Sequence, residues 1–242
     1  GEFLFELMDS ETGRMPMYGN NDGAYILPLS ECDFLDFRPV IQAAHYTVYR
    51  ERKFPSGPWD EDLVWLFGPE SLEKSNGDCP APVSSSFDAG GYSTLRQKDS
   101  WCMLRSHMYR DRPAHWDQLH LDLWWRGQNI LRDCGTYHYY VPGRPDLEYY
   151  YKSIRAHNTV EVDDANPLEL ASRFLWFPWP RGRRRDTGIR DTSYHYLEAE
   201  HYDYDRKPWN TLHRRIVVGL GEDLWVVIDD LLSHTDHNFR LR

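Results

Sequence analysis

Histidine and aspartate residues at three separate points of the sequence could bind a divalent metal ion. Zn²⁺ accepts imidazole nitrogen and carboxylate oxygen in tetrahedral sites, and His115, Asp133 and His157 offer these atoms. One strand, a turn and a second strand would fill the interval from His115 to Asp133, a spacing that places residues opposite each other in a hairpin. His157 follows on a later strand. Ordinary hydrogen-bonded structure is the alternative, because the chain has 11 histidines and buried polar groups are usually paired.

A β-strand is the element that must carry the first part of this pattern. Successive side chains of a strand point to opposite faces of the sheet. Leu119, Leu121 and Leu123 can therefore point into a core while His120 and Asp122 point away from it. The alternation predicts that a rigid sheet presents the polar groups.

Short apolar or alternating segments continue through most of the chain. Each is bounded by Gly, Pro, Asp or Asn, which is typical of an antiparallel sandwich rather than of βαβ units. A further strand begins at His237, and we expect the chain to stop within that sheet. The expected strands are Trp101–Ser106, Leu119–Trp125, His157–Val162, Tyr194–Glu200, His213–Gly219 and Leu224–Asp230.

The first part of the chain has a different, helical pattern. One helix is expected after Pro39 and a second from Asp60 to Phe67. The segment SNGDCPAPVSSS, Ser75 to Ser86, is rich in turn-forming residues and marks the boundary, so we expect one domain over residues 1–75 and a β domain over residues 76–242. The face of the first helix would carry Val40, Ala43, Ala44 and Thr47.

Composition excludes several classes of function. The formal net charge is −10, which argues against nucleic-acid binding because phosphate recognition depends on a basic surface. No stretch approaches the roughly 20 apolar residues of a membrane helix, so we expect no membrane insertion. The four cysteines (Cys32, Cys79, Cys102, Cys134) include no C-x-x-C pair and indicate neither a disulfide nor a zinc knuckle.

Two further features leave alternatives open. The chain has 10 Trp and 16 Tyr, which either stack on sugar rings in a cleft or fill a Trp-rich core. The basic segment from Pro180 to Asp191 either binds an acidic ligand locally, since charges farther than ~10 Å are screened, or is a solvated loop.

Three ordered motifs resemble the C-terminal β-sheet domain of the heparinase II/III-like polysaccharide lyases. They are His115-Trp-Asp117-Gln-Leu119, Leu131-Arg-Asp133-Cys-Gly135-Thr136-Tyr137, and Ala156-His157-Asn158-Thr159-Val160-Glu-Val162-Asp163. The resemblance implies a mainly β fold, an antiparallel sandwich, preceded by a short helical remnant of an (α/α) toroid. It also implies a structural divalent metal, commonly zinc, held by His115, Asp133 and His157, with Asp117 and Asn158 orienting the imidazoles.

By the same resemblance the activity is β-elimination on an acidic, uronate-containing polysaccharide such as a glycosaminoglycan or alginate. The base removes the proton beside the uronate carboxylate, and positioned donors stabilise the enolate-like charge. Tyrosine can act as acid or base in such chemistry, and Tyr150 matches the aromatic residue that reaches the family's cleft. The family has a catalytic histidine where this sequence has Pro113, so His107 is the nearest imidazole that could replace it.

The residues expected to bind substrate lie in two places. The loop MPMYGNNDGA resembles the segment that joins toroid and sheet in the family, although an Asn/Asp cluster flanked by glycine is first of all a turn. Arginine can bind a carboxylate bidentately, although each arginine equally suits a surface ion pair. The candidates are Tyr18, Asn20, Asn21, Asp22, Arg112 and Arg155.

The sequence therefore favours a polysaccharide lyase. The alternative is a non-catalytic carbohydrate-binding or exopolysaccharide-biosynthesis protein of the same fold, which Pro113 favours. An acidic polysaccharide is the expected partner, and a periplasmic or secreted location is expected although no signal peptide is visible.

Overall fold

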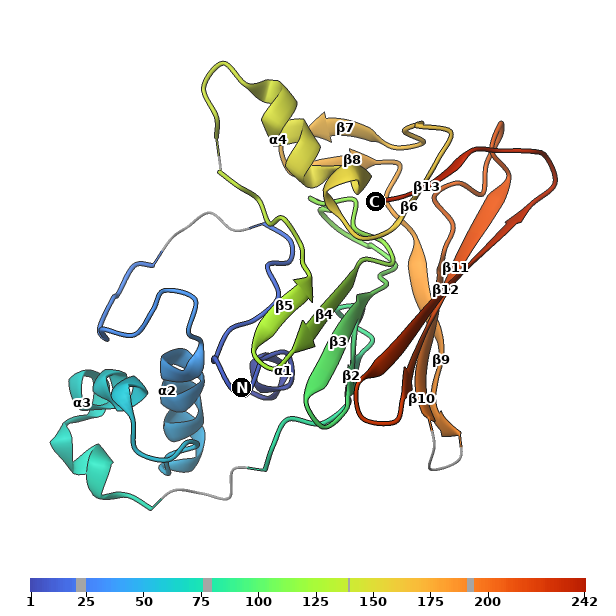
Figure 1. Ribbon diagram of the computed structural model, residues 1–242. Coiled ribbons are helices and arrows are strands. Elements are labelled where there is room, and N and C mark those ends of the chain that lie inside the picture. The colour runs from blue at the N-terminus through green and yellow to red at the C-terminus, as the bar shows by residue number, and fades with distance from the viewer. Residues whose placement is uncertain (21–24, 76–79, 139, 191–193) are drawn as a thin grey trace. The chain divides into compact units, whose positions relative to one another are not determined.

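The computed structural model describes the chain except residues 21–24, 76–79, 139 and 191–193 (Figure 1). The chain divides into two compact units. One comprises Gly1–Pro16 and Ala24–Val83, and the other comprises Met17–Gly23 and Ser84–Arg242.

The first unit contains the helices α1 (Glu2–Glu6), α2 (Arg38–Tyr49) and α3 (Glu61–Phe67). Pro39 stands in the first turn of α2, where its fixed φ suits a helix and its missing N–H is no loss. Both expected helices are confirmed.

The buried residues of α2 are not those that the sequence pattern grouped on one face. Ile41 and Tyr46 are buried, whereas Val40 is 47% exposed. The side chain of Gln42 explains the choice of face, because its Nε2 donates to Asp60 Oδ1 at 2.6 Å and its Oε1 accepts from the backbone of Lys53 and Phe54. A buried amide with these partners fixes the rotation of the helix.

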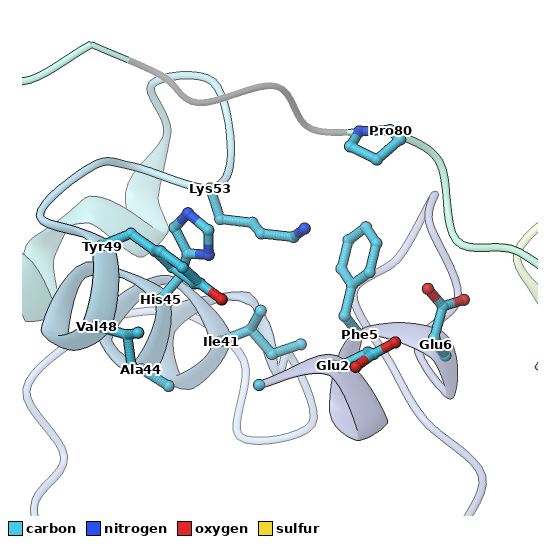
Figure 2. Close-up of a pocket in the computed structure, with 11 residues that line it drawn as sticks. Glu2, Phe5, Glu6, Ile41, Ala44, His45, Val48, Tyr49, Lys53 and Pro80 are labelled. Carbon is cyan, nitrogen blue, oxygen red and sulfur yellow. The ribbon is translucent and has the colours of Figure 1, made fainter. Parts of the chain in front are cut away.

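A cavity of about 360 Å³ lies in this unit between α1 and α2. Figure 2 shows the Lys53 side chain reaching toward Phe5, and its ammonium lies 3.8 Å from the centroid of that ring. The 3₁₀ turns Pro58–Asp60 and Pro69–Glu73 complete the first unit.

The second unit consists of antiparallel sheets, as the sequence predicted. One sheet has the order β1-β2-β3-β4-β5 and another the order β12-β11-β10-β9. Two small sheets pair β13 with β6 and β7 with β8. The strands are β1 Ser86–Phe87, β2 Tyr92–Arg96, β3 Ser100–Arg105, β4 Leu121–Trp125, β5 Gln128–Leu131, β6 Val160–Val162, β7 Glu169–Ser172, β8 Leu175–Phe177, β9 Gly182–Arg190, β10 Tyr194–His201, β11 Thr211–Leu220, β12 Leu224–Ser233 and β13 Phe239–Leu241.

The hydrophobic core of the sandwich lies between the two larger sheets. Strand β11 alternates strictly between buried and half-buried side chains, the pattern of a strand with one face on a core. Residues of both sheets, with Leu119 directly before His120 and β4, form one continuous cluster: Leu95, Cys102, Leu104, Leu119, Leu121, Leu197, Ala199 and Val217.

The tryptophans divide between core and surface. Trp116 and Trp176 are fully buried and pack with Tyr204 in a second core cluster. Trp125 and Trp179 are 41% and 39% exposed. The sequence could not separate these two groups, because tryptophan suits both environments.

Two segments differ from the sequence-based expectation. The basic segment after Pro180 is not a loop but forms β9, where Arg183 and Arg185 pair with Glu200 across the ladder to β10. Residues Pro145–Lys152 form helix α4, with proline in the first turn and Lys152 in the last.

No helix in the described part of the chain is both long enough and apolar enough to cross a bilayer.

Candidate metal centre

The β4–β5 hairpin decides which residues meet in the candidate metal centre. Leu123 pairs with Leu131 in this hairpin, and continuing that register places Asp133 level with Leu121. His115 and Asp133 both lie outside the strands, so the predicted cross-strand pairing of these two residues is wrong. His120 precedes β4 directly and is the imidazole that the hairpin brings to Asp133.

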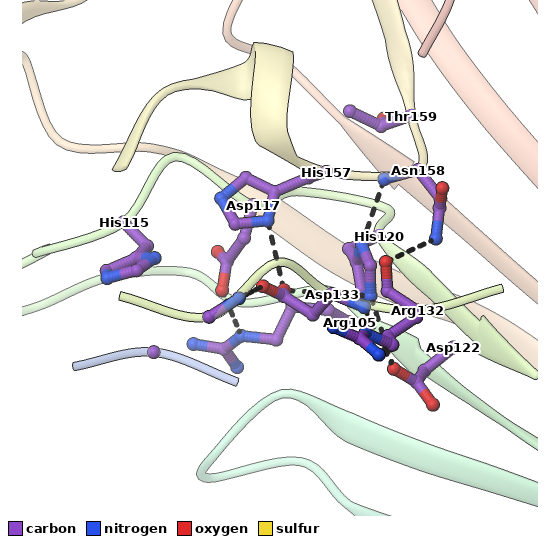
Figure 3. Close-up of polar contacts among 12 residues, drawn as sticks. Arg105, His115, Asp117, His120, Asp122, Arg132, Asp133, His157, Asn158 and Thr159 are labelled. Carbon is purple, nitrogen blue, oxygen red and sulfur yellow. Dashed lines mark hydrogen bonds and ion pairs between the residues drawn. The ribbon is translucent and has the colours of Figure 1, made fainter. Parts of the chain in front are cut away.

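Three buried side chains form the centre, and we call them the His/Asp cluster: His120, Asp133 and His157. Each is at most 2% exposed, and one ligand atom from each lies within 4.8 Å of the other two. His157 Nδ1 lies 3.0 Å from Asp133 Oδ2, and His120 Nε2 lies 3.6 Å from the same oxygen. Figure 3 shows these side chains converging from the hairpin and from the segment before β6.

The backbone fixes the orientation of Asp133. Gly135 has φ +66, a conformation in which glycine is not strained, and the turn lets its N–H donate to Asp133 Oδ1 at 2.7 Å. The backbone N–H of Asp133 donates in turn to Asp122 Oδ2 at 3.3 Å. The first bond orients the carboxylate of Asp133, and the second fixes the backbone that carries it.

The hydrogen bonds of His120 limit what this residue can bind. Its Nδ1 accepts the backbone N–H of Asn158 at 3.0 Å. A neutral imidazole that accepts at one nitrogen carries its proton on the other, so the Nε2 of His120 is an N–H. That nitrogen has no lone pair to offer a metal, although it lies nearest to Asp133.

His115 has the opposite arrangement. The Thr136 hydroxyl donates to Gly19 O, and its oxygen therefore faces His115 Nε2 at 3.5 Å as an acceptor. The lone pair of His115 is then on Nδ1, which is buried without a hydrogen-bond partner among the described residues. The His115 ring centroid lies 5.7 Å from that of His157.

The charges of the centre are set by burial and by these contacts. Burial opposes ionisation of Asp133, but the electrostatic interactions with His157 and His120 and the hydrogen bonds from His157 and Gly135 outweigh it and hold its pKa far below the usual range. Burial likewise works against a charged His157, yet Asp133 raises its pKa. His115 lacks such a partner, and burial lowers its pKa to about 4.

The residues present fit a bound Zn²⁺. His157 Nδ1 donates to Asp133 Oδ2, so the lone pair that His157 could offer a metal is on Nε2, which is buried without a hydrogen-bond partner among the described residues. In the centre, buried atoms without partners among the described residues lie on His115, Asp117, His120 and His157, and an unpaired buried polar atom is costly. Those on His115, Asp117 and His157 can offer a lone pair. A cation is the kind of ligand that such atoms bind.

Neighbouring residues hold the cluster in position. Asn158 donates its side-chain amide to Leu121 O and Arg132 O, which ties the segment of His157 to the hairpin. Asp117 does not bond an imidazole, because Arg105 Nε donates to its Oδ2 at 3.3 Å and both residues are buried.

One arginine of the four-stranded sheet hydrogen-bonds the segments that carry His120 and His157. Arg215 is 1% exposed, pairs with Asp229 at 2.8 Å, and donates to the carbonyl oxygens of Leu119 and Asn158. Leu119 directly precedes His120, and Asn158 directly follows His157. Sequence reasoning missed Arg215, which only the period-2 pattern of its strand could have indicated. It placed His120 on the face opposite Leu119 and Leu121 but did not select it for the metal centre.

The two predicted catalytic residues lie on different elements. Tyr150 is on α4, is 41% exposed and contacts Tyr151 edge to face. His107 follows β3, and its ring lies 4.6 Å from that of Tyr109. Burial and the Arg105 charge lower the pKa of His107. No contact joins Tyr150 to His107 within the described residues.

The predicted substrate-binding residues are also dispersed. Tyr18 packs its ring 4.9 Å from Tyr92, and Asn20 is exposed. Arg112 is exposed and stacks on Phe174 at 5.0 Å, whereas Arg155 Nε pairs with the buried Glu161 at 2.9 Å. Asn21 and Asp22 lie outside the described residues.

Comparison with known proteins identifies what this chain resembles. Residues 80–242 match the family model described as Heparinase II/III-like, C-terminal. A heparin-sulfate lyase of Bacteroides thetaiotaomicron is 23% identical over 239 residues, which cover 93% of this chain and 31% of that protein.

Solved structures share the fold. The heparan sulfate lyase HepC from Pedobacter heparinus superposes with a TM-score of 0.65 at 17% identity, covering 96% of this chain and 32% of that one. A heparinase III structure gives a TM-score of 0.58 at 18% identity, with coverage of 96% and 32%. The chain thus spans about a third of the length of these relatives.

Proposed function

The chain belongs to the heparinase II/III-like family, and from this premise we propose that it is part of a polysaccharide lyase acting on an acidic, uronate-containing polysaccharide. Heparan sulfate, named in the relatives' descriptions, is the first substrate to test. The observation that carries the proposal is the buried His/Asp cluster, built within the residues that match the family.

The proposed reaction is a β-elimination. A base takes the proton from C5 of the uronate, the C4–O bond breaks, a C4=C5 double bond forms, and the departing oxygen receives a proton. His107 is suited to accept the C5 proton, because burial and Arg105 lower its pKa and keep the imidazole neutral. Tyr150, exposed on α4, is suited to protonate the leaving oxygen.

The carboxylate of the substrate needs a positive partner, because its charge opposes removal of the neighbouring proton. Of the two predicted arginines, Arg112 is better suited. Its guanidinium is exposed and stacks on Phe174, whereas the charge of Arg155 is already matched by Glu161.

We further propose that a structural zinc ion is bound by His115, Asp133 and His157. When bound, the metal would contribute folding energy, because it would join the segments that carry these three side chains. Asp133 and His157 are buried at the junction of the β4–β5 hairpin and the segment before β6. The Gly135 N–H, which donates to Asp133 Oδ1, would orient this carboxylate.

A direct assay tests the lyase proposal. The complete natural protein, with its zinc content measured, is incubated with heparan sulfate, chondroitin sulfate and alginate while ultraviolet absorbance of the unsaturated product is followed. A rise with one polymer is expected, and His107→Ala and Tyr150→Phe are expected to lower its rate by about 10²-fold or more. No rise with any polymer, from zinc-loaded and folded protein, would overturn the proposal.

Pro113 favours a second candidate, a non-catalytic carbohydrate-binding or exopolysaccharide-biosynthesis protein. Proline has no group that transfers a proton, and here it is buried with its carbonyl accepting the N–H of Trp176 at 2.8 Å. Such a protein would bind the acidic polymer without forming unsaturated product.

A further inference from the structure

A groove separate from the His/Asp cluster opens on the second unit. It has a volume of about 590 Å³, within the range of small-molecule sites. Three segments form it: the residues after β3, the connection from β8 to β9, and the residues after β10. Its lining is Met108, Tyr109, Phe177, Pro178, Trp179, Arg181, Asp205 and Arg206.

Hydrogen bonds join the three segments into a fixed frame. Met108 and Arg181 form a β-bridge, and the N–H of Arg181 donates to Asp203 Oδ1 at 2.7 Å. The N–H of Tyr202 donates to Arg181 O at 2.8 Å. A ligand would therefore meet a preorganised site, which lowers the entropic cost of binding.

Two aromatic side chains in the groove face solvent. Phe177 is 61% exposed and Trp179 is 39% exposed, although large apolar side chains usually gain by burial. Tyr109 forms another wall, and its hydroxyl accepts from Arg105 at 2.8 Å. Flat apolar faces beside polar edges are suited to stacking against the C–H face of a sugar ring.

The arginines of the groove differ from the others in the basic segment. Arg183, Arg184 and Arg185 each pair with a carboxylate. Arg181 and Arg206 make no ion pair among the described residues, and each instead donates to one backbone carbonyl.

The charge of the lining is therefore positive on balance. Asp205 is the one carboxylate in the lining, against two guanidinium groups. This excess is local, since the net charge of the chain is −10, and it favours an acidic ligand in the groove. Asp205 can accept hydrogen bonds from sugar hydroxyls.

We propose that this groove binds one acidic sugar unit of a polysaccharide, stacked on Trp179 with its carboxylate or sulfate on Arg181 and Arg206. The groove borders the proposed base, because the Tyr109 ring lies 4.6 Å from that of His107. The choice of polysaccharide rests on the proposed function, whereas binding at the groove does not require that the chain cleave anything.

Calorimetric titration with an unsaturated heparan sulfate disaccharide tests the proposal without turnover, because this ligand has no further linkage to eliminate. Trp179→Ala is expected to raise the Kd about 3- to 10-fold, the range for an aromatic contact. Arg181→Gln and Arg206→Gln are each expected to raise it similarly, with an effect that shrinks as salt is added. Cellobiose, which is neutral, is expected to bind at least about 10-fold more weakly.

Matched control variants lie elsewhere on the same unit. Trp125→Ala removes a tryptophan of equal exposure, 41%, and Arg144→Gln removes one positive charge. Both are expected to leave the Kd unchanged. Equal Kd values for the Trp179 and Trp125 variants, or no binding to the wild-type protein, would overturn the groove proposal.

The lyase assay separates this proposal from the proposed function. Disaccharide binding that depends on Trp179, without cleavage of any polymer, would support the groove and reject the lyase. Cleavage of a polymer, together with disaccharide binding that Trp179→Ala does not change, would support the lyase and reject the groove.

Discussion

At the scale of single residues, the hydrogen-bond partner of each imidazole decides which nitrogen can act. His120 accepts a backbone N–H at Nδ1 and therefore carries its proton on Nε2, 3.6 Å from Asp133, whereas His115 keeps a buried lone pair without a partner among the described residues. His120 is the imidazole that lies closest to Asp133 and His157. The proposed ligand is nevertheless His115, because its Nδ1 carries the lone pair that a metal requires.

The metal proposal makes a prediction that separates these two histidines. His115→Asn is expected to lower zinc affinity at least ~10-fold and to reduce thermal stability with it, because metal binding contributes folding energy. His120→Asn is expected to lower zinc affinity less. Zinc content by mass spectrometry and melting curves measure both effects. Unchanged zinc content in His115→Asn would remove this residue from the ligand set.

Asp133 is expected to be the most sensitive residue of the centre. Asp133→Asn keeps the shape but removes the charge that faces two imidazoles, and we expect a loss of about 2–4 kcal/mol in the free energy of unfolding, as for other broken buried pairs. Urea denaturation measures the loss. Asp146→Asn, on an exposed pair with Arg144, is the control and should show no resolvable change.

At the scale of elements, β11 connects the four-stranded sheet to the centre. Arg215 holds Leu119 O and Asn158 O, and Leu119 has φ +59, a conformation that costs a residue with a side chain about 1–2 kcal/mol. The arginine thus stabilises a strained backbone next to His120.

Replacing this arginine by lysine should disturb the centre from a distance. Lysine cannot reproduce the planar fork, so Arg215→Lys is expected to cost about 2–4 kcal/mol of unfolding free energy and to shift the ring NMR signals of His120 and His157. Arg214→Lys, one position along the same strand and 25% exposed at its side chain, is expected to cost less than about 1 kcal/mol. Equal losses in the two variants would contradict the positioning role.

The same strand predicts a pH dependence. Burial lowers the pKa of His213 to about 4, although Asp229 favours its charged form, because Arg215 already balances that carboxylate. The unfolded chain binds this proton near pH 6.5, so the contribution of His213 is fully present above pH 6.5 and is lost as pH falls toward 4.

The loss from this one group is expected to reach about 3 kcal/mol. Urea unfolding of the wild-type protein and of His213→Asn between pH 7 and pH 4 isolates it. The variant should show a flatter decline, and identical slopes would contradict a neutral buried His213.

The sequence predicted the elements better than the contacts among them. The alternation in 194–200 and 213–219 was sufficient to identify β10 and β11, because period 2 reports a strand directly. It did not identify the partner of Asp133, since the register of a hairpin depends on where its turn falls. Helix α4 was missed although Pro145, followed by acidic residues, indicated its start.

At the scale of the whole molecule, the family match gives the fold, and individual residues must supply the function. The match covers residues 80–242, and the chain spans 31% of the heparin-sulfate lyase that it resembles. Folds carry many functions, and Pro113 stands where the resemblance implies a catalytic histidine. The claim of elimination therefore depends on His107 and Tyr150.

The mass of the cleavage product tests this claim most directly. The complete natural protein is incubated with a heparan sulfate tetrasaccharide, and the fragments are weighed by mass spectrometry. Elimination adds no water, so the account predicts one fragment lighter by one water molecule than the hydrolysis product, with a double bond at its non-reducing end. Fragments of hydrolytic mass, or an intact tetrasaccharide with folded, zinc-loaded protein, would contradict it.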